Sequence, residues 1–157
     1  MTMVISGDNG LTYPNSTTQA SAGQVLQVVN AIYSTSASST VNTYANTGLT
    51  ATITPKFATS KILVLVNQNS NIGFSAAGIQ FRLLKNGTAL FVIDDVNTYV
   101  SPAGTVGGGS ASTCYLDSPA TTSATTYSTQ FANRAATGTV VTTYNGSSTI
   151  TLMEIAA

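Results

Sequence analysis

The stretch "FRLLKNGTALFV", residues 81–92, decides the fold class of this chain. Its Asn86-Gly87 pair stands between two apolar runs, and this dipeptide readily adopts the positive φ angles that the centre of a type I′ turn requires. The sequence therefore predicts that residues 81–85 and 88–92 pair as an antiparallel hairpin. This hairpin favours an all-β protein.

Short runs rich in Val, Ile, Thr, Tyr and Phe continue on both sides of the hairpin, separated by Gly, Pro, Asn and Ser. No window shows a helical period with start and stop signals. Strands are expected at residues 24–33, 49–53, 61–69, 79–85, 88–94, 112–116, 125–132, 139–144 and 149–155. Nine short strands without helices predict an antiparallel sandwich or barrel.

Three connections between the expected strands are informative. Asn145-Gly146 predicts a second hairpin between the last two strands. Residues 34–48 are polar and are expected to contain an edge strand or to lie across the outside. Residues 100–112 are rich in Gly, but no helix or Lys follows them, so we expect a plain connection and not a phosphate-binding loop.

The first 22 residues consist of turn-forming sequence and cannot build a core. We therefore divide the chain into an extended arm, residues 1–22, and one domain, residues 23–157. Two alternatives are open for the arm. It is either loose, or a strap that becomes ordered against a partner, because Leu11, Tyr13 and Pro14 would be sticky if left free.

Composition excludes several classes of function. Five basic and five acidic residues give no net charge and make up only 6% of the chain, against about 25% in typical soluble domains. Without a basic cluster, nucleic-acid binding has no electrostatic driving force. The longest apolar run, residues 62–66, is far shorter than the roughly 20 residues that a membrane helix needs. We expect neither nucleic acid nor membrane as a partner.

Catalytic and metal-binding groups are scarce. With no His and a single Cys, the chain can form neither a Ser-His-Asp triad, nor a Cys–His zinc site, nor an internal disulfide. Asp94 and Asp95 would point to opposite faces of a strand and could not share a proton. Asp117 is expected to cap a turn, and Cys114 to be a small buried hydrophobe. We expect no enzyme and no cofactor.

The tyrosines leave two alternatives open, a carbohydrate-binding surface or caps at the two ends of a sandwich. Those concerned are Tyr33, Tyr44, Tyr99, Tyr115, Tyr127 and Tyr144.

The chain ends in "SSTITLMEIAA", residues 147–157, which is apolar on both faces of the expected strand. One face carries Ile150, Leu152 and Glu154, and the other carries Thr151, Met153 and Ile155. The second sheet of the sandwich would cover one face, and a neighbouring subunit the other. A buried Glu154 would then need a partner, for which the available cations are Lys61, Arg82 and Arg134.

Several segments together resemble a jelly-roll module of tailed-bacteriophage virion proteins, similar in plan to the trimeric tumour-necrosis-factor and C1q heads. They are "GQVLQVVNAIYSTS", "GLTATITPKFATSKILVLVNQN", "FRLLKNGTAL", "YLDSPATTSATTYSTQF" and "SSTITLMEIAA". The resemblance implies a homotrimeric jelly-roll β-sandwich with the last strand near the threefold axis. The trimer interface would then comprise Ile150, Leu152, Met153, Glu154 and Ile155.

The resemblance implies a structural role on the virion surface. In the first hypothesis the chain is a capsid decoration, or cement, protein whose arm binds the major capsid protein. We expect a chain that begins at Met1 and ends with the module to be complete, with little room for a tail-fibre shaft. The alternative is the receptor-binding head of a tail or head fibre that recognises cell-surface glycans. A carbohydrate-active enzyme is disfavoured by the lack of a carboxylate pair.

Overall fold

The computed structural model describes residues 4–6, 10–12, 18–19, 23–73, 77–100 and 107–157. Within these ranges the chain forms strands and no helix, so none of the described segments is a helix that could cross a membrane. The strands are β1 (Val4–Ser6), β2 (Gly10–Thr12), β3 (Thr18–Gln19), β4 (Val25–Tyr33), β5 (Ala37–Ser39), β6 (Ala45–Ile53), β7 (Lys61–Gly73), β8 (Ala77–Lys85), β9 (Thr88–Val100), β10 (Gly107–Asp117), β11 (Thr125–Asn133), β12 (Thr139–Thr142) and β13 (Ser148–Ile155).

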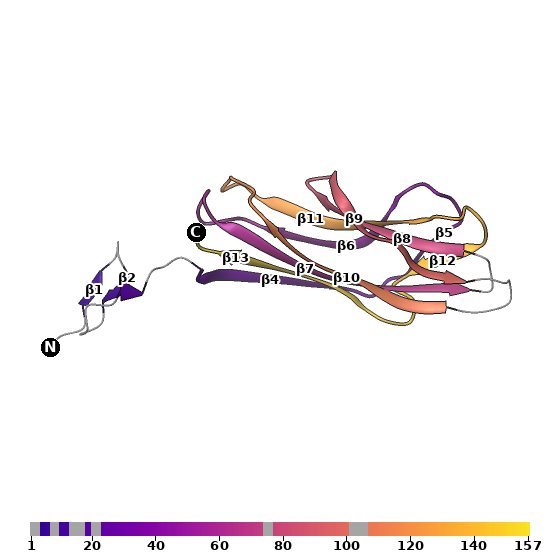
Figure 1. The fold of residues 1–157 in the computed structure, drawn as a ribbon, viewed down its shortest axis with the longest axis horizontal. Helices are drawn as coiled ribbons and strands as arrows, with labels where there is room; N and C mark the ends of the chain where they lie inside the picture. Colours follow the sequence, from indigo (N-terminus) through magenta and orange to yellow (C-terminus); the bar gives the residue numbers. More distant parts are fainter. Residues whose placement is uncertain (1–3, 7–9, 13–17, 20–22, 74–76, 101–106) are drawn as a thin grey trace.

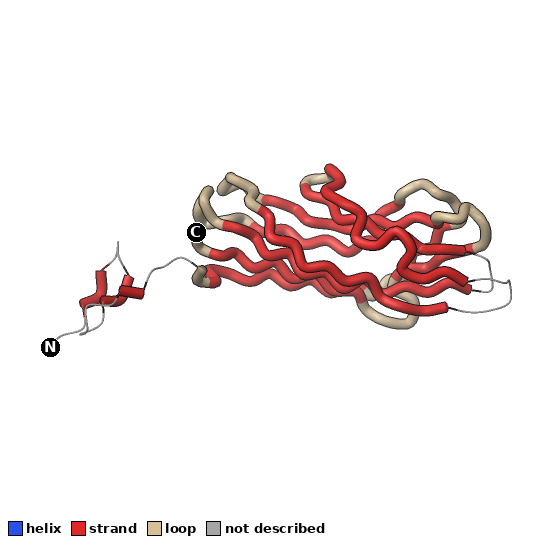
Figure 2. The backbone as a smooth tube through the Cα atoms, in the orientation of Figure 1, coloured by secondary structure: helices blue, strands red, loops and turns tan. Residues whose placement is uncertain are grey.

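Two antiparallel sheets form a sandwich (Figures 1 and 2). One sheet has the order β4-β13-β7-β10, with β12 and β5 beside the far part of β7. The other has the order β6-β11-β8-β9. Counted along the chain, the eight long strands are arranged first-eighth-third-sixth and second-seventh-fourth-fifth. This is the strand order of a jelly roll, so the predicted all-β jelly-roll sandwich is confirmed.

The central hairpin is confirmed in detail. Lys85 pairs with Thr88, and both turn residues have positive φ, 49° at Asn86 and 81° at Gly87. All nine expected strands are present, and β7 and β9 extend to 13 residues each.

The second predicted hairpin is wrong. β12 and β13 do not pair with each other but lie end to end along one edge of β7, with Thr142 opposite Ser70 and Thr149 opposite Asn67. The turn at Asn145 therefore joins two strands that share a partner.

Both alternatives for residues 34–48 occur. β5 is a short edge strand beside β12. The segment after it then crosses the outside of the β6-β11-β8-β9 sheet, where Gln80 donates a hydrogen bond to Asn42 (2.7 Å). The guanidinium of Arg82 lies over the ring of Tyr44, 3.9 Å from its centroid.

The core consists of two apolar clusters with a polar layer between them. The first cluster comprises Leu49, Ala51, Ile53, Ile62, Val64, Val66, Leu83, Tyr127, Ile150 and Leu152. The second comprises Ile72, Ala77, Ile79, Phe81, Ala111, Phe131 and Val140.

Gln68 of β7 is the centre of the polar layer. Its side-chain amide donates to the hydroxyls of Thr142 (2.5 Å) and Ser148 (2.8 Å) and accepts from Thr129 of the opposite sheet (2.8 Å). The hydroxyl of Thr129 in turn lies 2.6 Å from that of Thr47. All five side chains are buried, and their mutual hydrogen bonds offset the cost of removing them from water.

The first 22 residues contribute the strands β1 to β3, which form a small antiparallel sheet of their own. Among the described residues, this sheet pairs with no strand of the sandwich. Leu11 lies in β2 opposite Ile5, whereas Tyr13 and Pro14 lie outside the described residues.

Position 48 in β6 requires a glycine because of its backbone angle and the close approach of a neighbouring ring. It has a φ of 90°, and a Cβ at this position would lie 2.2 Å from the ring of Tyr33. Gly87 also has positive φ, but a Cβ there would meet no atom within 4 Å.

We predict that Gly87→Ala lowers the free energy of unfolding by about 1–2 kcal/mol, the cost of positive φ alone. Gly48→Ala should cost about 2–5 kcal/mol, because overpacking adds to the same strain. Urea unfolding measures both. Adding Tyr33→Ala should make the Gly48→Ala loss smaller than it is alone, and equal losses at the two glycines would contradict this account.

Candidate functional site

The outer face of the β4-β13-β7-β10 sheet carries one row of apolar side chains that runs across all four strands. The rows on either side of it are mixed and also contain polar residues such as Asn30, Thr151 and Thr149. In the central row Val28, Met153, Leu63 and Leu116 stand side by side in register. We name the apolar face as the set Val25, Val28, Ile32, Leu63, Leu65, Cys114, Leu116, Met153 and Ile155. In the four rows that these residues occupy, the only charged side chain is Lys61, in the row at one end.

β4 contributes the most exposed members of this face. The exposed fractions are 54% for Val25, 55% for Val28 and 67% for Ile32. β4 is also an edge strand, because it pairs only with β13 among the described strands. These residues were not among those predicted at an interface, although the run "VLQVVNAIY" has apolar residues at both alternating sets of positions.

The outer face of the opposite sheet has different chemistry. It carries hydroxyl and amide side chains that bond to one another, such as Thr52 with Thr126 (2.8 Å) and Gln130 donating to Asn46 (2.8 Å). This face also exposes Val92 on β9, but none of its described cross-strand rows is apolar throughout, unlike the Val28-Met153-Leu63-Leu116 row. A contiguous apolar patch of this kind marks an interaction site in a folded protein.

A shallow hollow of about 360 Å³ lies on the apolar face beside Leu65 and Cys114, bordered by the polar side chains of Asn67, Ser112, Thr149 and Thr151. Cys114 is exposed here, so its prediction as a buried hydrophobe is wrong. The reason is strand alternation, which places Cys114 and Leu116 on the outer side of β10.

The residues predicted at a trimer interface separate into two groups. Ile150, Leu152 and Glu154 have no exposed surface and face the interior of their own sandwich. Their assignment to a subunit contact is therefore corrected, because the chain's second sheet already covers that side. Met153 and Ile155 alternate with them, are partly exposed and lie on the apolar face.

The expectation that a cation neutralises Glu154 is also wrong. Its Oε2 accepts a hydrogen bond from Gln27 Nε2 (2.6 Å), and its Oε1 accepts from the backbone N–H groups of Lys56 (2.7 Å) and Phe57 (3.4 Å). Burial raises the pKa of the Glu154 carboxyl, but these donors outweigh burial and hold the pKa below its usual value. A charged side chain is thus kept inside the fold by neutral donors.

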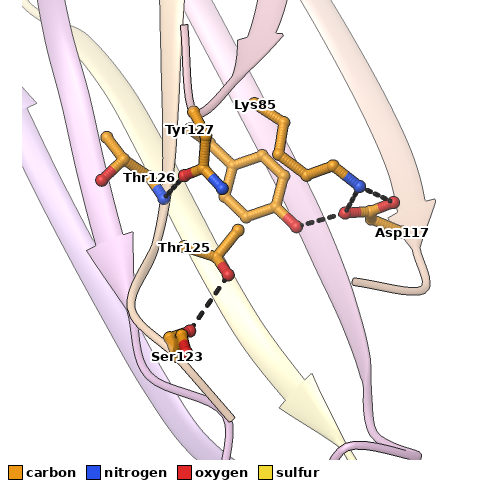
Figure 3. A network of polar contacts seen from close by, with 7 residues as sticks. Lys85, Asp117, Ser123, Thr125, Thr126 and Tyr127 are labelled. Carbon is orange, nitrogen blue, oxygen red and sulfur yellow. Dashed lines mark hydrogen bonds and ion pairs between the residues drawn. The ribbon is translucent and has the colours of Figure 1, made fainter. Parts of the chain in front are cut away.

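Asp117 is a second buried carboxylate near the same end of the sandwich. Figure 3 shows the Lys85 ammonium (2.9 Å) and the Tyr127 hydroxyl (2.6 Å) converging on it. Burial raises the pKa of Asp117, but the bonds from Tyr127, Lys85 and the backbone of Ser118 lower it overall. The bond to Ser118 agrees with the expected turn cap. The pKa of Tyr127 is raised by burial and by the carboxylate, so the tyrosine remains a donor.

The two other acidic candidates, Asp94 and Asp95, bind different partners. Asp94 accepts from the backbone of Val96 (3.0 Å), while Asp95 pairs with Arg134 (2.9 Å). In the described part of the chain, no three His, Cys, Asp or Glu side chains gather to hold a metal ion.

The tyrosines proposed for sugar binding are dispersed. Tyr115 packs edge-on against Phe91, with 5.1 Å between ring centroids, and Tyr127 is fully buried. Tyr99 and Tyr144 are exposed by 59% and 47%.

Comparison with known proteins gives likenesses of fold to viral capsid proteins. The VP2 subviral particle of infectious bursal disease virus aligns with 96% of this chain and 40% of its own length, at 14% identity and a TM-score of 0.48. A structure of the Gt strain of the same virus aligns with 99% of this chain and 47% of its own chain, at 12% identity and a TM-score of 0.44. This chain thus spans less than half of those proteins. No family model and no curated protein matches it.

We predict that the two buried carboxylates, Glu154 and Asp117, make the free energy of unfolding decrease at acidic pH. Because their folded pKa values lie below the unfolded ones, their contribution is present above about pH 4 and is lost as the pH falls through the folded pKa. Glu154→Gln should lower the free energy of unfolding at pH 7 by about 2 kcal/mol. It should lose less stability than the parent between pH 5 and pH 2.5 in urea titrations, and parallel pH profiles would contradict the assignment.

Proposed function

We propose that this chain is a non-enzymatic structural protein of a virus particle, a homotrimeric decoration (cement) protein on the capsid of a tailed bacteriophage. The observation that carries the proposal is the apolar face, a sheet surface that a single chain leaves in contact with water. The jelly-roll strand order and the resemblance in sequence support the same class of protein.

The size of the face fits an interface between copies. Four strands and about seven residues along each give a footprint of roughly 400 Å². Covering the apolar side chains within that area supplies a hydrophobic contribution to binding, from which the cost of association is subtracted. A standard interface buries about 800 Å² per partner, so each copy needs a second contact beyond the face.

β4 supplies that second contact and favours a ring. It is a nine-residue edge strand without charge or proline, and such edges invite pairing or aggregation unless they are covered. A twofold contact of face on face would leave the β4 edge open. A contact of the β4 edge on the face of the next copy covers both, and a rotation of about 120° between copies would close it as a trimer.

The position of the arm supports attachment at one end of the molecule. The backbone N–H of Gly23 donates to the carbonyl of Ala156 (2.7 Å), and the N–H of Ala156 donates to the carbonyl of Gln24 (2.9 Å). The arm therefore begins beside the last residues of the described sandwich (Figure 1). In a symmetric trimer all three arms begin at the same end, where we place the major capsid protein as partner.

We predict that Val28→Asp and Met153→Asp each reduce the sedimenting mass from trimer to monomer, because each places a charge in the proposed contact without touching the core. Ile155→Asp should act in the same way. Val92→Asp is the matched control, since Val92 is 48% exposed on the opposite sheet. A trimer that survives Val28→Asp and Met153→Asp would refute this placement of the interface.

We predict that deleting residues 1–22 leaves the trimer intact but lowers its occupancy on purified particles severalfold. Quantitative electrophoresis of particles and imaging of the head measure this effect. Undiminished occupancy would show that the arm is not a strap. The same images test the role itself, because copies spread over the head indicate a decoration protein, whereas a few copies at the tail indicate a fibre head.

A further inference from the structure

The loop of residues 54–60, between β6 and β7, carries an exposed aromatic side chain on an anchored backbone. Phe57 is 57% exposed. The backbone around it is anchored from several sides: Glu154 accepts from the N–H groups of Lys56 and Phe57, and Ser60 donates to the carbonyl of Phe57 (3.1 Å). Gln27 adds a bond to the carbonyl of Thr54 (2.7 Å).

The end of β13 holds this loop and the root of the arm together. Glu154 binds the loop, and Ala156, two residues later, binds Gly23 and Gln24 through its backbone. The Lys56 ammonium adds a direct link, because it donates to the carbonyl of Leu26 (3.1 Å) at the start of β4. Phe57 and the root of the arm, at residues 23 and 24, therefore lie at the same end of the sandwich.

The exposed charged side chains near this end are basic. Lys56 and Lys61 are exposed, whereas the carboxylates of Glu154 and Asp117 are buried and already bonded. Residues 23–27 and 54–61 contain no acidic side chain. A partner that fits this end would present an acidic surface around an apolar recess.

We propose that Phe57 is the aromatic anchor by which the arm-bearing end docks onto an acidic, recessed surface of the shell protein, with Lys56 and Lys61 at the rim. This inference rests on the proposed function and deepens it. Buried aromatic side chains supply much of the energy at protein interfaces. A ring on a loop that is already ordered loses little further conformational freedom when it binds.

The test measures binding of the full-length protein to particles of its own virus assembled without it. Phe57→Ala should weaken binding at least tenfold, and Phe57→Trp should largely retain it. Tyr99→Ala is the matched control, because Tyr99 is an equally exposed aromatic residue on β9, outside the loop and the arm root, and it should bind as the parent does. Lys56→Glu should weaken binding severalfold and reduce its dependence on salt.

The outcomes separate this inference from the proposed function. If the parent binds and Phe57→Ala binds as tightly as Tyr99→Ala, the anchor is refuted while the decoration role stands. If the parent does not bind the particles at all, both proposals fail. Sedimentation of Phe57→Ala should still give the parent's mass, and a loss of that mass would assign Phe57 to the contact between copies and overturn its role as a shell anchor.

Discussion

The architecture depends on one constraint, a sheet that is apolar on both of its sides. In β7 the inward Ile62, Val64 and Val66 pack against the second sheet, while the outward Leu63 and Leu65 face solvent. β13 repeats the pattern beside it. Sheets with two apolar faces are stable when both faces are covered. The described residues of one chain cover one of these faces, and the proposed trimer would cover the other.

Polar groups are distributed so that the molecule has two different ends. The buried carboxylates Glu154 and Asp117 lie near the end where the arm begins, and each fixes a neighbouring segment through its hydrogen bonds. The layer around Gln68 then separates this end from the second apolar cluster. Beyond it, the outer side of β7 carries Asn69 and Asn71 in place of leucines. The apolar part of this outer face and its polar remainder therefore lie on the same sheet.

Local signals in the sequence predicted the strands and the fold class, but not the contacts that depend on distant residues. Asn86-Gly87 was sufficient for the central hairpin because the turn and both strands lie in one short stretch. Asn145-Gly146 carries the same signal, yet β7 takes both flanking strands as partners. Charge alone indicated a cation for Glu154. Its actual partners, the Gln27 amide and two backbone N–H groups, follow from the shape of the 54–60 loop, which no local pattern encodes.

The scarcity of charge bears on why such a face can assemble specifically. Copies with no net charge do not repel one another at long range. Electrostatic repulsion would therefore oppose neither the first contact between two copies nor the closing of a ring. Lys61 stands in the end row, and a contact centred on Val28 and Met153 leaves its ammonium at the hydrated rim. In the proposed trimer, specificity would come from the shape of the surfaces and from the β4 edge. A contact between two different surfaces grows without limit unless its rotation closes, so the angle at which that edge meets the next copy decides between a ring and a fibre.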